Sequence, residues 1–172
     1  MYTFYPKIDY KFDDFNTIRM VDITVTTKIK NFFSEYAAIA LQPYIIQNGE
    51  RPDQVSKRIY DTPYYDYILL MVNNIDNIHD QWPRNQEAFR NYLVEKYGSV
   101  SYTLSTIGHY YSPEGDIVSQ EFWNAISSSQ KYTKTIYEEE TEANDAKARI
   151  RVIDLPFIVR FESDLQELLS KK

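Results

Sequence analysis

Residues 44–74, which read YIIQNGERPDQVSKRIYDTPYYDYILLMVNN, decide the expected fold of the middle of this chain. The β-branched and aromatic residues at the start of the stretch are typical of a strand, and Asn48-Gly49-Glu50 has the composition of a tight turn. Pro52 and Pro63 each suit the first position of a helix, where the missing N–H has no intrahelical partner in any case. We therefore predict a strand over residues 41–47, a turn and two consecutive helices.

Apolar residues recur in the predicted helices at the spacing that gathers them on one face. A third helix is expected between Asn85, which can cap its start, and Gly98, which can end it. These faces predict a helical core beside the strand. The apolar positions are Val55, Ile59 and Tyr60 on the first helix, Tyr65, Ile68, Leu69 and Val72 on the second, and Phe89, Tyr92, Leu93 and Tyr97 on the third.

The whole chain is predicted to be an α+β protein in three segments: an N-terminal arm (1–40), a central domain with its following helix (41–98), and a C-terminal part with strands and a terminal amphipathic helix (99–172). In the arm we expect an extended stretch at 1–20, a strand at 22–27 and a short helix at 28–40. Further along we expect loops at 75–83 and 123–129, β-like stretches at 99–107 and 132–137, and a turn at 112–116. The terminal helix is expected from Pro156, with Phe157, Phe161, Leu165 and Leu168 facing inward.

Composition excludes several classes of function. The 172 residues include 19 Lys and Arg against 25 Asp and Glu, and this net charge of −6 argues against nucleic-acid binding. The chain has no Cys, so disulfides and thiolate metal sites are excluded. No stretch is apolar for long enough to span a membrane, and the first ten residues lack the pattern of a signal peptide. We expect a protein that is made and used in a cytoplasm.

The sequence carries no motif for catalysis or cofactor binding. The two histidines, His79 and His109, have no potential metal ligand at a suitable spacing, and we predict ordinary surface or turn positions for both. The four glycines never cluster into a phosphate-binding loop. The adjacent acids at 13–14 and 138–140 are not the separated pair of a glycosidase, and we interpret them as solvated charge. We therefore predict no enzyme activity, no metal and no cofactor.

The strand, turn and helices of the central segment resemble the LysM module, a small βααβ domain that usually binds polymers of N-acetylglucosamine. By this resemblance Gly49, Pro52 and Pro63 shape the turns, and Leu69 belongs to the core. Trp82 either packs in the core or serves as an exposed anchor. The resemblance rests on these scaffold positions: Tyr44, Ile46, Gly49, Pro52, Ile59, Tyr60, Pro63, Leu69, Asn73 and Trp82.

A longer pattern resembles the small baseplate wedge subunit of T-even-like contractile-tailed bacteriophages. The resemblance covers residues 21–170 and is closest over 44–98. The matching stretches are GERPDQV at 49–55, IYDTP at 59–63, ILLMVNN at 68–74, WP at 82–83 and FRNYLVEKYG at 89–98, followed by YEEE at 137–140, NDAKARIRVI at 144–153 and FIVRF at 157–161.

This resemblance implies a structural protein of the virion tail baseplate that is assembled in the cytoplasm of the bacterial host. Its expected partners are other wedge subunits and the inner baseplate, and its expected role is to link neighbouring wedges around the hub. Aromatic anchors on extended segments would supply the binding energy. The expected interface residues are Tyr2, Phe4, Tyr5, Tyr10, Phe12, Phe15, Phe157 and Phe161.

Other interpretations stay open at the level of sequence. The arm could fold back on its own domain instead of docking on a neighbour. The central segment could be a peptidoglycan-binding module, with a groove near residues 49–54 and 73–76. The single copy of the motif and the lack of an export signal argue against that alternative. An enzyme of unknown chemistry is a third and weaker possibility.

Overall fold

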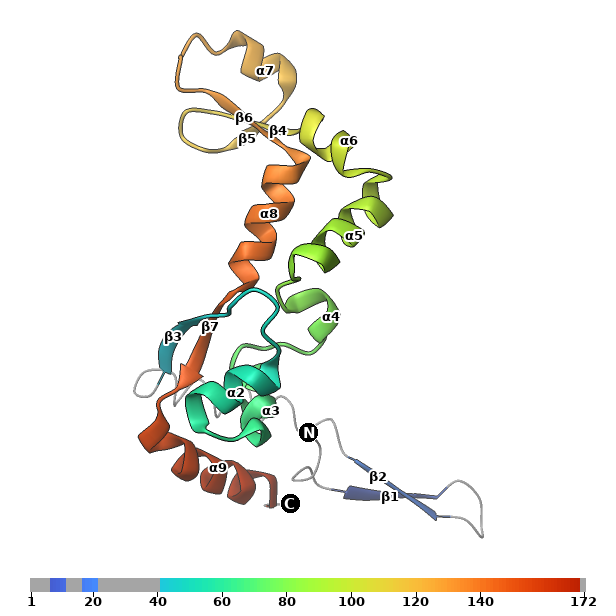
Figure 1. The fold of residues 1–172 in the computed structure, drawn as a ribbon, viewed down its shortest axis with the longest axis vertical. Coiled ribbons are helices and arrows are strands. Elements are labelled where there is room, and N and C mark those ends of the chain that lie inside the picture. Colours follow the sequence, from blue (N-terminus) through green and yellow to red (C-terminus); the bar gives the residue numbers. More distant parts are fainter. Residues whose placement is uncertain (1–6, 12–16, 22–40, 171–172) are drawn as a thin grey trace. The chain divides into compact units, whose positions relative to one another are not determined.

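The structure is a computed structural model that describes residues 7–11, 17–21 and 41–170 (Figure 1). Helices and strands are interspersed along the chain, which confirms the predicted α+β class. In chain order the elements are β1 (Lys7–Lys11), β2 (Thr17–Val21), β3 (Leu41–Ile45), α2 (Pro52–Tyr60), the 3-10 helix η2 (Pro63–Tyr65), α3 (Asp66–Val72), α4 (Ile78–Gln81), α5 (Gln86–Tyr97), α6 (Val100–Ser105), β4 (Ile107–Tyr111), β5 (Ile117–Val118), α7 (Gln120–Ala125), β6 (Tyr132–Thr135), α8 (Ile136–Lys147), β7 (Arg149–Ile153) and α9 (Leu155–Ser170).

The described residues form two compact units, and each unit is discontinuous in sequence. The first unit contains residues 7–11, 17–21, 41–44, 51–76 and 151–170. The second contains residues 45–50 and 77–150, so it is largely an insertion between two parts of the first.

The core of the first unit joins the helices α2 and α3 to the C-terminal strand and helix. The phenol of Tyr60 donates a hydrogen bond of 2.9 Å to the carbonyl of Ile153, across 93 positions of sequence. Burial raises the pKa of the Tyr60 hydroxyl well above its ordinary value. The side chains that are at most 2% exposed here are Val55, Ser56, Ile68, Leu69, Leu70, Ile153, Ile158, Phe161 and Leu165.

The predicted start of the central domain is present, with β3, a turn, α2, η2 and α3 in the expected order. Thr62 caps η2 by accepting a hydrogen bond from the backbone of Tyr64, and Pro63 occupies the first position. The partner of β3 is β7, which lies about a hundred residues later in the sequence. Within residues 75–98 the structure has only helices, so the second strand of a LysM-like βααβ arrangement is not found inside the predicted central segment.

The second unit combines α5, α6 and α8 with a three-stranded sheet in the order β5-β4-β6. The central strand β4 pairs antiparallel with both neighbours. Helix α6 packs on α5 and on α8, and Leu93 and Thr103 are fully buried there. The predicted helix from Asn85 to Gly98 is confirmed, since the Asn85 side chain caps α5 and Gly98 ends it with a φ of 85°.

Several sequence predictions for the second unit are wrong, and side-chain capping explains each difference. Residues 100–105, expected to be β-like, form α6, because the Ser99 hydroxyl accepts a hydrogen bond from the backbone of Tyr102. Ser119 likewise caps α7, which extends into the loop expected at 123–129 as far as Ala125, and Asn77 caps the short α4 within the loop expected at 75–83. The β-like stretch 132–137 ends early because Thr135 starts α8 with a capping box.

Part of the predicted arm lies outside the described residues. This holds for the strand expected at 22–27, the helix expected at 28–40 and five of the rings expected at an interface, namely Tyr2, Phe4, Tyr5, Phe12 and Phe15. The described parts of the arm, β1 and β2, are both strands, but they pair antiparallel as a hairpin, which is not predicted from the sequence. Among the described helices none is long and apolar enough to cross a membrane.

Candidate protein docking surfaces

Strands β1 and β2 form an antiparallel hairpin with one apolar face. Ile8 pairs with Met20, and Tyr10 pairs with Ile18. Because side chains alternate between the faces of a sheet, these four residues lie together on the same side. They are all half-exposed, with exposed fractions of 50% for Ile8, 48% for Met20, 55% for Tyr10 and 52% for Ile18. We call this set the hairpin face.

The opposite side of the hairpin is polar. Lys7, Asp9 and Lys11 alternate with the apolar residues of β1, and Arg19 lies across from Asp9. The Arg19 guanidinium approaches the Asp9 carboxylate to 3.4 Å, and both side chains are largely exposed. An exposed ion pair of this kind contributes little to stability. The hairpin is therefore amphipathic, with a solvated face and a face that leaves contiguous apolar surface in water.

The predicted interface residues are distributed unevenly over these surfaces. Tyr10 belongs to the hairpin face, whereas its neighbours Ile8, Ile18 and Met20 were not singled out in the sequence. The pairing register of the two strands places these residues next to Tyr10, and this register cannot be read from the sequence alone. On α9 the ring of Phe161 is fully buried in the core of the first unit, which agrees with its predicted inward-facing position and corrects the expectation that it serves as an interface residue.

Helix α9 has an exposed apolar pair that the ring-based prediction missed. Phe157 is partly buried. Leu155 and Val159, one helical turn apart, have exposed fractions of 54% and 68%. The most exposed large apolar side chains of this helix are therefore aliphatic.

The turn after β3 is clamped from inside the second unit. Gly49 has a φ of +77°, a conformation that favours glycine. The indole N–H of Trp82 donates a hydrogen bond of 2.8 Å to the carbonyl of Glu50, and the Glu50 carboxylate accepts from the backbone N–H of Gln47 at 2.9 Å. Trp82 is 6% exposed and Ile46 is 5% exposed. Trp82 thus lies in the interior and not at a free surface.

The remaining scaffold positions belong to the first unit. Pro52 is buried at the start of α2, and Pro63 is exposed at the start of η2. Tyr44 and Ile59 are partly buried, and Leu69 is 1% exposed. Asn73 ties α3 to β7, because its amide donates to the carbonyl of Arg151 at 2.8 Å and accepts from the N–H of the same residue at 2.8 Å.

The acidic run at the start of α8 is structural, so its interpretation as solvated charge is wrong for two of its members. Glu140 accepts hydrogen bonds from Lys96 at 2.7 Å, Tyr97 at 2.6 Å and Tyr92 at 3.1 Å. Burial opposes its ionisation, but these donors outweigh burial and hold the pKa of Glu140 below its ordinary value. The ammonium of Lys96 has a raised pKa for the reciprocal reason.

Glu139 anchors the same helix to the sheet. Its carboxylate lies 2.8 Å from Nδ1 of His109 and accepts a hydrogen bond of 3.2 Å from the hydroxyl of Tyr111. Gly108 makes this approach possible, because a Cβ there would stand 2.4 Å from a Glu139 oxygen. His109 is therefore part of a structural contact between β4 and α8.

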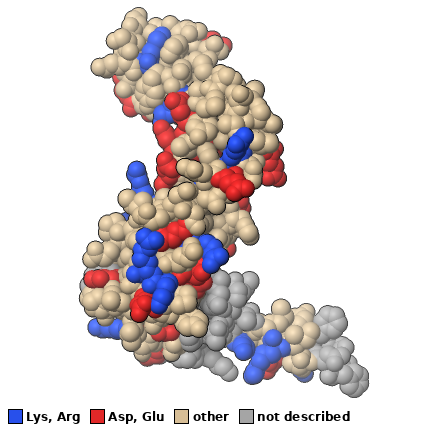
Figure 2. Space-filling view, in the orientation of Figure 1, with Lys and Arg blue, Asp and Glu red and all other residues tan. Residues whose placement is uncertain are grey.

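The described residues can be compared with the requirements of a metal site. In the described ranges there is no group of three or more His, Cys, Asp or Glu that could hold a metal ion. His79 is exposed on α4. On the face drawn in Figure 2, basic and acidic side chains are interspersed and no extended basic patch is seen.

Comparison with known proteins gives the family. A family model described as "Base plate wedge protein 53" matches residues 1–154. The curated "Baseplate wedge protein gp53" of Enterobacteria phage T4 is 25% identical, over an alignment that covers 99% of this chain and 96% of that protein. Neither comparison supports the peptidoglycan-binding alternative. The chain therefore belongs to the base plate wedge protein 53 family and is a structural component of the tail baseplate of a phage virion.

Proposed function

We propose that this subunit links neighbouring wedge subunits of the baseplate, and that the hairpin face is one of its docking elements. The protein acts by binding and not by catalysis. The observation that carries the proposal is the amphipathic hairpin, in which Ile8, Tyr10, Ile18 and Met20 are about half-exposed on a single side. Contiguous exposed apolar surface of this kind marks interaction sites in soluble proteins.

The expected binding energy can be estimated from burial. Covering a fully exposed large apolar side chain contributes about 1.5–3 kcal/mol, so covering the exposed half of each of the four contributes roughly 1 kcal/mol per residue. A total of about 4 kcal/mol is a substantial contribution to the binding free energy, but it is too small to hold a stable complex by itself, because association has a free-energy cost of similar or larger size. The hairpin therefore acts together with other contacts of the subunit.

The test compares two neighbouring substitutions that add the same charge to opposite faces. Ile18→Asp places a carboxylate in the hairpin face, whereas Thr17→Asp places it on the polar side. Each variant of the full chain is co-expressed with the other wedge subunits of the same phage, and the complexes are separated by size-exclusion chromatography with mass determination. We expect Ile18→Asp to weaken co-elution at least tenfold, because a charge would be buried without a partner.

The Thr17→Asp variant should co-elute as the unaltered chain does. Equal incorporation of both variants into the complex would contradict the docking role of the hairpin face. Loss of incorporation with both variants would point to a general effect of charge on the hairpin and would equally count against the proposal. Circular dichroism of each isolated variant confirms that the fold is retained before either result is interpreted.

A further inference from the structure

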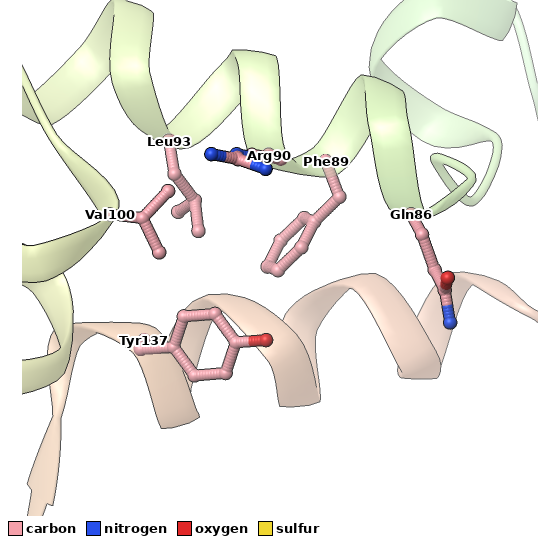
Figure 3. A pocket seen from close by; sticks show the side chains of 6 residues that line it. All are labelled: Gln86, Phe89, Arg90, Leu93, Val100 and Tyr137. Carbon is pink, nitrogen blue, oxygen red and sulfur yellow. The ribbon is translucent and has the colours of Figure 1, made fainter.

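The second unit contains a pocket of about 350 Å³ between α5, the start of α6 and α8. Figure 3 shows that its side chains converge from the facing helices, with Phe89 and Tyr137 opposite each other across the gap. Their ring centroids are 6.1 Å apart. The lining residues are Gln86, Phe89, Arg90, Leu93, Val100 and Tyr137.

The inner part of the pocket is apolar and firmly held. Leu93 is fully buried, and Val100 and Phe89 are partly buried. Phe89 stacks on Tyr92 with a centroid distance of 6.4 Å, and Tyr92 is itself bound to Glu140. The floor is therefore held by the same contacts that join α5 to α8.

The rim carries polar groups that lack a partner. In the part of the chain that the structure describes, no hydrogen bond or ion pair engages the side chains of Gln86 and Arg90 or the hydroxyl of Tyr137. Two other cations of the same unit are engaged: Arg84 lies 4.2 Å from the centre of the Tyr92 ring, and Lys134 pairs with Glu142. An unpaired guanidinium beside an apolar pocket suits a ligand that combines an apolar body with a carboxylate.

We propose that this pocket is a docking site for a segment of another baseplate component that presents one large apolar side chain next to an aspartate or glutamate. The apolar side chain would lie against Phe89 and Val100, and the carboxylate would pair with Arg90. A volume of about 350 Å³ is near the lower end of ligand pockets, which suits a single bulky side chain better than a whole helix. The site extends the proposed linking role, on which it rests, to a second surface.

The first measurement uses the full chain and two small probes, acetyl-Phe-Asp-amide and acetyl-Phe-Asn-amide. Titrations are followed by the backbone amide NMR signals of Phe89, Arg90 and Val100. Both probes should shift these signals, and the Asp probe should bind roughly threefold more tightly, which is the size of an exposed ion pair. In Arg90→Gln the two probes should become equal, whereas Arg149→Gln, an exposed arginine that does not line the pocket, should preserve the difference.

Three results would overturn the pocket proposal: no shift at the pocket signals with either probe, equal binding of both probes to the unaltered chain, or an unchanged difference in Arg90→Gln. These results are independent of the hairpin face. If the probes fail while Ile18→Asp still prevents incorporation into the wedge complex, only the pocket assignment falls. If the probes bind as expected while Ile18→Asp incorporates normally, the hairpin proposal falls and the pocket remains as the supported docking site.

Discussion

Replacing Glu140 by glutamine tests whether the acidic run of α8 holds the second unit together. The Glu140 side chain is 17% exposed, and its carboxylate accepts hydrogen bonds from Lys96, Tyr97 and Tyr92, which all belong to α5. Glutamine keeps the shape of the side chain and can still accept hydrogen bonds with its carbonyl oxygen. The substitution therefore removes the charge and replaces one of the two acceptor oxygens by an NH2 donor.

The size of the effect follows from the contacts. A hydrogen bond to a charged group contributes about 1.5–3 kcal/mol and a neutral one about 0.5–1.5 kcal/mol, so each retained bond loses about 1 kcal/mol. The Lys96 side chain is about half-exposed, so solvent screening reduces the contribution of the Lys96–Glu140 ion pair to the free energy of unfolding. We expect a loss of about 2 kcal/mol, which corresponds to a fall in Tm of roughly 4–8 °C for a chain of this length.

The effect also has a direction in pH. The pKa of Glu140 is lowered in the folded chain, so its stabilisation is present above the pKa of an unfolded glutamate and is lost as pH falls through the folded value. The difference between the unaltered chain and Glu140→Gln should be full at neutral pH and should close in acid, below about pH 4. A packing defect would give a difference that is the same at both pH values.

The assay follows tryptophan fluorescence during thermal unfolding, because both tryptophans of the chain, Trp82 and Trp123, belong to the second unit. Glu142→Gln is the matched control on the same helix: Glu142 is 61% exposed and pairs with Lys134, so we expect a change of less than about 0.5 kcal/mol. If Glu140→Gln and Glu142→Gln unfold at the same temperature at neutral pH, the reasoning about the buried carboxylate is refuted.

Three further substitutions test other contacts, each measured by guanidinium unfolding followed by circular dichroism. Asn73→Ala removes both hydrogen bonds to the backbone of Arg151 and should cost about 2 kcal/mol; a loss below about 0.5 kcal/mol would show that the bridge does not hold α3 to β7. Gly108→Ala should cost about 1–2 kcal/mol because Glu139 must move away, and an unchanged stability would mean that the close approach is dispensable. Trp82→Phe leaves a buried carbonyl without its donor and should cost about 1–3 kcal/mol, whereas a neutral outcome would argue that water replaces the indole N–H.

The parts of the fold that sequence could predict are those with local signals. Pro52 and Pro63 mark helix starts, Asn85 and Gly98 delimit α5, and all four act as expected. The same kind of signal is present at Ser99, where a single capping hydroxyl favours a helix against the β-propensity of the following residues. Capping residues are therefore better evidence than propensity for short segments.

Pairing across long distances could not be predicted. Strand β7 lies beside β3 although most of the second unit separates them in sequence. Neither strand contains information about its partner beyond an apolar character that many strands share. The resemblance to a LysM module suggested a local second strand, and the insertion removed the basis for that expectation.

The candidate site shows a similar division. The choice of rings included Tyr10, which is half-exposed, and Phe161, which is buried as its inward-facing spacing on the terminal helix predicts. The presence of a ring does not by itself show that a side chain is exposed. Glu140 was misjudged for the complementary reason: its donors come from a helix more than forty positions earlier in the chain. Exposed anchors and paired charges are properties of tertiary contacts and cannot be read from one segment.

The stability of the hairpin also depends on tertiary contacts, and this dependence bears on its proposed docking role. An isolated two-stranded sheet is marginally stable in water, and this one has only five paired positions with an apolar side left exposed. A partner that covers the hairpin face would supply the layer that a two-stranded sheet needs for stability. Docking and stabilisation of the hairpin are then the same event, so part of the binding energy is spent on ordering the strands. A loss of binding in Ile18→Asp accordingly measures the packed hairpin as a whole and not one side-chain contact.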